Sequence, residues 1–111
     1  MAAYQTSLQG EFDHFVHYIK NEVLNRSSSA SLEEELEERL GQVRCCLLAF
    51  ERYSFTGSNR VSLSVTILGA GQQLEVMAAA TGGSQAMFFK VNTWGEESFL
   101  DTLVEAVENY Q

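Results

Sequence analysis

The recurrence of apolar residues at every second position is the feature that most constrains how this chain can fold. Apolar residues occupy every second position in two runs, 61–67 and 74–80. A period of two places alternate side chains on one face of an extended strand, so each run predicts a strand with one buried face. Gly69 and Gly71 lie between the runs and favour a tight turn. We therefore expect an antiparallel hairpin.

Further strands are predicted on either side of this hairpin. Residues 43–55 are apolar or aromatic at both alternate sets of positions, with few exceptions. Such a composition is typical of a strand covered on both faces, so we expect a central strand there. Residues 3–7 predict a short extended entry to the fold. Residues 86–91 predict a fourth strand or a buried crossing segment, and we favour the strand.

Helical signals occur in three other segments. Residues 11–24 carry apolar side chains at helical spacing, namely Phe12, Phe15, Val16, Ile19 and Val23. A capping-box spacing and leucines at every fourth position predict a second, shorter helix over residues 31–40. The same capping signal precedes an amphipathic segment over residues 93–109, which predicts a final helix.

These elements predict the order β-α-α-β-β-β-β-α within one α+β domain that spans residues 1–111. We expect a two-layer sandwich, in which an antiparallel sheet of about four to five strands has its helices on one face. The sequence contains no internal repeat, no proline and no long linker, so nothing in it divides the chain into two domains.

Charge and composition argue against several classes of partner. The formal net charge is -8, from 15 acidic and 7 basic side chains, and the bases are scattered. Such a chain repels phosphate backbones and anionic lipid, so we expect no nucleic acid and no membrane as partners. The first residues lack the pattern of a signal peptide, and the longest apolar run, Cys45 to Phe50, is too short to span a bilayer. We expect a soluble, cytoplasmic protein with free thiols at Cys45 and Cys46.

Two features could in principle bind a metal or a charged partner. His14 and His17 lie three apart on the first predicted helix, but they fall opposite its apolar face, so we favour a solvated face and expect no metal and no cofactor. The final helix contains five acidic residues. A solvated face is the default interpretation, and a basic protein partner or a loosely held cation is the alternative.

Glu51 and Arg52 interrupt an apolar strand, which indicates a paired structural charge. The functional alternative is a carboxylate at the floor of a pocket, with Tyr53 beside it. Residues Gly82, Gly83, Ser84 and Gln85 favour a turn that needs positive φ, and their alternative role is a loop whose amides converge on an anion. Ser84 has no nucleophile-elbow context, so no catalytic residue is predicted.

A resemblance rests on four runs of the sequence: Phe50-Glu51-Arg52-Tyr53, Ser58-Asn59-Arg60-Val61-Ser62-Leu63, Gly82-Gly83-Ser84-Gln85, and Thr93-Trp94-Gly95-Glu96-Glu97 with Phe99-Leu100. With these runs the chain resembles a small family of uncharacterised proteins from Firmicutes. The resemblance implies a short, stand-alone protein of a domain-of-unknown-function class and brings no activity with it. The element order is also similar, in reduced form, to that of helix-grip domains.

Three functional hypotheses follow. The first is a non-catalytic binding or regulatory module, in one form a homodimer, that uses the sheet face or the acidic final helix. The second is a carrier of a small hydrophobic ligand, with Trp94 among its aromatic lining residues and residues 82–85 as the mouth. The third is an enzyme built on Glu51, Tyr53 and Ser84, for which the chain offers residue types without a recognisable arrangement.

Overall fold

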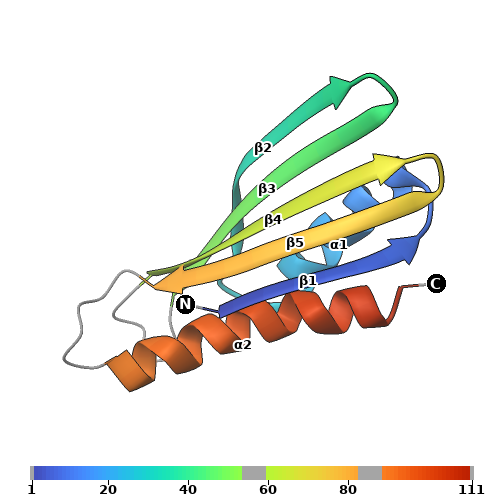
Figure 1. Cartoon of the computed structure of the whole chain (residues 1–111). Helices are drawn as coiled ribbons and strands as arrows, with labels where there is room; N and C mark the ends of the chain where they lie inside the picture. Colours follow the sequence, from blue (N-terminus) through green and yellow to red (C-terminus); the bar gives the residue numbers. More distant parts are fainter. Residues whose placement is uncertain (1, 54–59, 83–88, 111) are drawn as a thin grey trace.

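The computed structural model describes residues 2–53, 60–82 and 89–110 and has the α+β class that the sequence predicts (Figure 1). Its elements, in chain order, are β1 (Ala2–Gln9), α1 (Phe12–Arg26), β2 (Ser31–Leu40), β3 (Val43–Tyr53), β4 (Arg60–Ala70), β5 (Gln73–Gly82) and α2 (Phe89–Glu108). The five strands form one sheet in the order β1-β5-β4-β3-β2, and all neighbouring strands are antiparallel.

Two tight turns connect four of the five strands of this sheet in pairs. Gly41 joins β2 to β3 and Gly71 joins β4 to β5, and both glycines have a φ of 61°. A positive φ of this size is accessible to glycine without steric penalty and matches the twist of a two-residue hairpin. Strand β1 completes the sheet by pairing with β5, so that the first and the fifth strands lie side by side.

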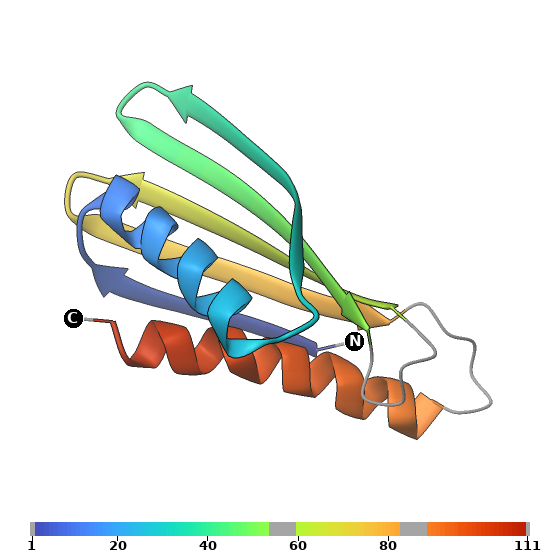
Figure 2. The same ribbon diagram turned by 180° about the vertical axis from the view of Figure 1, so that it is seen from behind.

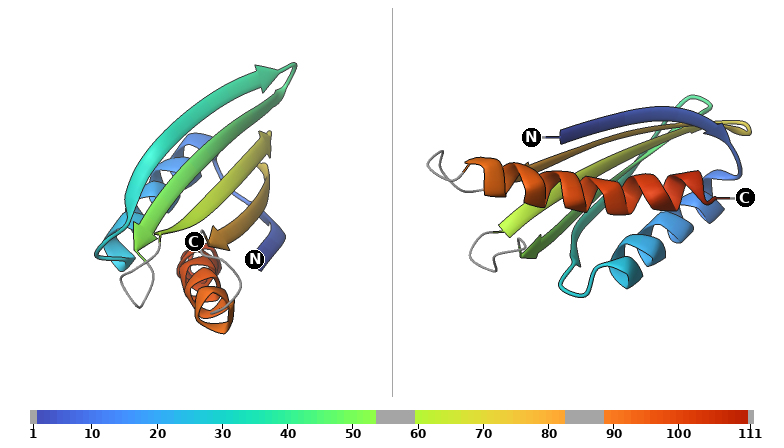
Figure 3. Two further views of the ribbon diagram at one scale, coloured as in Figure 1. Left: turned by 90° about the vertical axis from the view of Figure 1, so that its left-hand side faces the viewer. Right: turned by 90° about the horizontal axis from the view of Figure 1, so that it is seen from below.

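The inner face of the sheet is the face whose side chains pack into the hydrophobic core. Every second residue of β4 and β5 is buried there, which confirms the two alternating runs in the sequence. These residues share one core cluster with the apolar side chains of both helices. Helix α1 packs against β2, β3 and β4, and α2 packs against β1, β4 and β5 (Figures 2 and 3).

Contacts between the two helices cover the side of the core that faces away from the sheet. The hydroxyl of Tyr18 on α1 donates a hydrogen bond of 2.7 Å to the carbonyl oxygen of Ala106 on α2. The ring of Phe15 meets that of Tyr110 edge to face, with centroids 4.9 Å apart. Such pairs add about 0.5 to 1.5 kcal/mol beyond the apolar area they bury.

The prediction of a helix over residues 31–40 is wrong, because this segment is strand β2, paired along its length with β3. The register of β2 shifts between Leu32 and Glu34, so Leu32 faces Phe50 and packs against the core, whereas Leu36 and Leu40 face Leu47 and Val43 on the other side of the sheet. The intervening run of glutamates places like charges four residues apart, which is unfavourable in a helix. The observed order is therefore β-α-β-β-β-β-α.

Two further expectations need correction. Residues 89–91, expected in a strand, form the first part of α2, which thus begins before the predicted capping box; residues 86–88 lie outside the described residues. Strand β3 is an interior strand with β2 and β4 on its two sides, as predicted, but it is not covered on both faces. Only its inner face is buried, while Val43, Cys45 and Leu47 on its other face retain exposed surface.

Candidate functional site

In the described part of the chain, the outer face of the sheet lies opposite the helices and is not covered by them. Residues that face one another across paired strands define rows on this surface. One row consists of Ala3, Ala79, Ser64, Ala49 and Glu34, and the next consists of Gln5, Met77, Thr66, Leu47 and Leu36. Glu34, at the β2 end of the first row, is charged, and the other nine residues are not. We call these nine residues the central patch.

Acidic residues lie around the central patch. Glu34 and Glu38 stand on the edge strand β2, where they face Ala49 and Cys45. Glu75 faces Leu68 in the next row and accepts a hydrogen bond of 2.7 Å from the Ser7 hydroxyl. An uncharged centre with a charged periphery is the pattern of protein interfaces, in which charged residues are depleted at the core.

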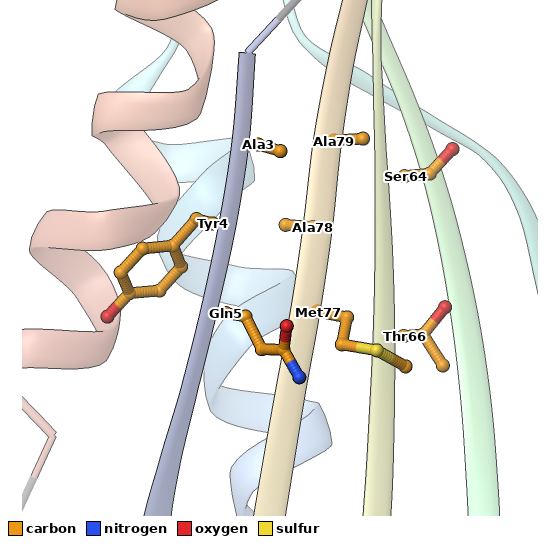
Figure 4. A pocket seen from close by; sticks show the side chains of 8 residues that line it. All are labelled: Ala3, Tyr4, Gln5, Ser64, Thr66, Met77, Ala78 and Ala79. Atoms are coloured by element: carbon orange, nitrogen blue, oxygen red, sulfur yellow. The ribbon is translucent and has the colours of Figure 1, made fainter.

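A shallow hollow of about 430 Å³ lies over β1, β5 and β4. Figure 4 shows Ala3, Gln5 and Met77 beside Ser64 and Thr66 on this side of the sheet. The small side chains of the first row create the hollow, and the Met77 side chain borders it. Methionine is flexible and polarisable, so it adapts its shape to an apolar partner surface.

Large apolar side chains extend this surface toward the β2–β3 hairpin. Leu36 is 57% exposed and Leu40 is 82% exposed, and Val43 faces Leu40 across the two strands. Together with Met77, which is 40% exposed, they form an apolar surface that the helices do not cover. The row of Glu38, Cys45, Leu68 and Glu75 separates Leu40 and Val43 from the row that contains Leu36 and Met77, so these exposed apolar residues form two groups on the same face.

Sequence reasoning named the sheet face as a possible contact surface but missed its apolar part on β2. Ser62, Ser64, Thr66 and Glu75 predict a polar outer face that also suits a contact between two sheets, and the assignment of residues 31–40 to a helix removed Leu36 and Leu40 from the sheet. Residues 31–40 show no alternation of apolar and polar positions, so no local signal identifies this segment as a strand.

Among the predicted site residues, Glu51 and Tyr53 lie at the end of β3 and both contact Arg60 of β4. The Glu51 carboxylate pairs with the Arg60 guanidinium at 2.6 Å, and that guanidinium lies 5.6 Å from the centre of the Tyr53 ring. Glu51 faces Ser62 on the outer face, whereas Arg52 faces the buried Val61 on the inner face. The structure therefore assigns the two adjacent charges to opposite faces of the sheet.

The predicted glycine-rich loop is described only in part. Gly82 ends β5, and its backbone N–H donates to the Glu96 carboxylate of α2 at 2.6 Å. A Cβ at this position would lie 2.7 Å from Oε2 of the same carboxylate, so a larger residue would displace the Glu96 side chain. Gly83, Ser84 and Gln85 lie outside the described residues, as does the side chain of Trp94, whose backbone is in α2.

The two histidines have different hydrogen-bond partners. His14 shares a hydrogen bond of 2.6 Å with the Tyr110 hydroxyl, and His17 shares one of 3.0 Å with Asn21. No group of three or more metal-ligating side chains is present in residues 2–53, 60–82 and 89–110.

Both cysteines are free. Cys46 lies on the inner face, where burial, reinforced by nearby glutamates, raises the pKa of its thiol to about 11.

Comparison with known proteins places the chain in a family. Residues 1–111 match a protein family described as "Family of unknown function (DUF6054)". The chain belongs to this family. No curated protein and no solved structure shows a significant match to this DUF6054 chain. In the described part of the chain, neither helix is both long and apolar enough to cross a membrane.

Proposed function

We propose that this DUF6054 chain is a cytoplasmic, non-catalytic binding module that pairs with a second copy of itself through the outer face of its sheet. In this proposal the helices and the sheet form two layers, and the open side of the sheet supplies the interface. The observation that supports the proposal most strongly is the uncharged central patch, which spans all five strands.

The dimensions of the surface suit a dimer. Five strands at their usual spacing, each about ten residues long, present a face of roughly 700 Å². Stable protein interfaces bury about 800 Å² on each partner. Small and flat side chains such as Ala3, Ala49 and Ala79 allow two sheets to approach to about 10 Å, the usual separation in packed sheets.

Charge distinguishes a second copy from a basic protein partner. Each chain carries a formal charge of -8, so two copies repel one another at long range while their apolar patches attract at contact. Added salt screens this repulsion, and we expect it to strengthen a homodimer. Salt would weaken the attraction of a basic partner instead.

The test is light scattering coupled to size-exclusion chromatography, at low and high salt, on the natural chain and two variants. Met77→Lys places a charge in the central patch and is expected to abolish the dimer. Asn21→Lys is the matched control, because it makes the same change of charge on an exposed position of α1 and is expected to leave the dimer intact. A monomer under every condition would refute the proposal, and salt-sensitive capture of basic proteins would assign the face to a different partner.

A further inference from the structure

A second region of interest lies on the inner side of the sheet, where β3, the end of α1 and α2 meet. Arg52 of β3 donates hydrogen bonds of 2.9 Å to two serine hydroxyls, from Nη1 to Ser27 and from Nη2 to Ser98. Its guanidinium carbon lies 4.5 Å from the centre of the Phe99 ring. Arg52 thus joins three elements that are far apart in the sequence.

No carboxylate pairs with Arg52 among the residues that the structure describes, although acidic side chains outnumber basic ones by 15 to 7. Residues 54–59 and 83–94 contain no aspartate or glutamate in their sequence either. Burial lowers the pKa of the Arg52 guanidinium, and no neighbouring charge contributes to this shift. A half-buried cation without a counterion is unusual, because buried charges are normally paired.

Arg44, at the other end of β3, provides an internal comparison. It also lies over a helix phenylalanine, with its guanidinium carbon 4.4 Å from the centre of the Phe12 ring. Two carboxylates neutralise Arg44, since it contacts Asp13 at 2.7 Å and Glu37 at 2.6 Å. At Arg52, serine hydroxyls take the place of the two carboxylates. The described residues therefore do not neutralise the positive charge of Arg52.

A hollow of about 260 Å³ opens beside Arg52. It is lined by Arg26, Ser27, Ser28, Ser29, Arg52, Tyr53 and Ser98. Each serine hydroxyl that accepts from Arg52 keeps its own O–H to donate, and the guanidinium has five N–H groups, of which these two bonds use two. The volume is smaller than that of a pocket for a drug-sized ligand, so the hollow suits a small molecule or a single chemical group.

We propose that this hollow binds a phosphate group, held by the Arg52 guanidinium and the hydroxyls of Ser27 and Ser98. The donors come from β3, from the residue that follows α1 and from α2, and all three residues line the hollow. A tetrahedral anion with several oxygens can accept from all of them, whereas a carboxylate has only two oxygens in one plane. The phosphate supplies a negative charge that no described carboxylate provides to Arg52. The site is separate from the outer face and does not depend on the proposed dimer.

The test is a titration of the ¹⁵N-labelled chain with inorganic phosphate at constant ionic strength, followed by NMR. We expect saturable shifts of the Ser27, Ser28 and Ser98 amides, with a dissociation constant of about 1 mM or lower. Arg52→Met is expected to weaken binding at least about tenfold, since charge-assisted hydrogen bonds are the strongest in such a site. Arg39→Met is the control, because it removes the same charge at an exposed position near the opposite end of the sheet.

Ser98→Ala provides a variant that keeps the charge, and we expect it to fold normally because Ser98 is exposed. It should weaken phosphate binding severalfold while Arg52 remains in place. Phosphoserine binding more tightly than inorganic phosphate would indicate a phosphomonoester as the ligand, and equal affinities would indicate free phosphate. Absence of saturable shifts, equal weakening by Arg52→Met and Arg39→Met, or equal binding of acetate would each overturn the proposal.

Discussion

The two faces of β3 place similar residues in opposite surroundings. Leu48 on the inner face is fully buried beneath the helices, whereas its neighbour Leu47 lies on the outer face and is only partly buried. Cys46 and Cys45 differ in the same way. The apolar side chains of the inner face pack against the helices. Similar side chains on the outer face have no helix to pack against. The contrast indicates that the first face holds the fold together and that the second is available for another molecule.

Substitution of the adjacent leucines should give the largest difference between the faces. Leu48→Ala removes a fully buried side chain and is expected to lower the free energy of unfolding by about 3 kcal/mol. Leu47→Ala at a monomeric concentration is expected to lower it by less than about 1 kcal/mol. Urea denaturation of both variants measures the difference, and similar losses would mean that the outer face also belongs to the core.

The two thiols should react at very different rates. Burial raises the pKa of Cys46 from 9.0 to about 11, so its thiolate is about a hundredfold scarcer than that of an ordinary thiol at neutral pH. We expect a disulfide reagent to label Cys45 first and Cys46 only after unfolding. If the outer faces pair, Cys45 also becomes protected as the protein concentration rises. Rapid labelling of Cys46 in the native protein would contradict the assignment of the faces.

Gly69 provides a smaller test of how tightly the inner face is packed. A Cβ at this position would lie 2.6 Å from the Cδ1 atom of Phe12, so Gly69→Ala forces α1 to shift. We expect a loss of about 1 to 3 kcal/mol in the free energy of unfolding. Gly10→Ala, whose Cβ would be 3.0 Å from the Tyr110 ring, should have a milder effect. A stabilising effect of Gly69→Ala would mean that the inner face is loosely packed there.

The ion pair between Asp13 and Arg44, at the rim of the inner face, should contribute the least to the free energy of unfolding. The hydrogen bonds from Arg44 hold the pKa of the exposed Asp13 carboxyl below its usual value of 3.8. A lowered pKa in the folded state stabilises the protein above the ordinary pKa, and the contribution is lost as the pH falls through the folded pKa. Asp13→Asn should therefore lower the melting temperature slightly at neutral pH and not at all in strong acid. A difference that persists in acid would have another origin.

The strength of the sequence signals explains which parts of the fold could be predicted from them. The alternation in residues 61–67 and 74–80 is unambiguous, because its period fits only a strand with one buried face. The pattern of residues 31–40 is misleading, because leucines four apart fit one face of a helix, whereas pairing with β3 makes the segment a strand. Local signals carry no information about that pairing, which joins Leu36 to Leu47.

The candidate sites were harder to predict for a related reason. The central patch combines residues from all five strands, so it exists only once the register is known. The sequence did identify Glu51 and Arg52 as unusual charges, but their surroundings depend on which face each residue occupies. Arg52 meets Ser27 and Ser98, which lie 25 and 46 residues away, and no spacing in the sequence predicts that contact.

Sedimentation equilibrium of the natural chain tests the proposed pairing of outer faces most directly. The account predicts a mass that rises with concentration from 12.4 kDa toward twice that value, and a dimer that becomes tighter as salt is added. A mass of one chain at every concentration and salt level would contradict it, since the outer face would then be stable in water without a second copy.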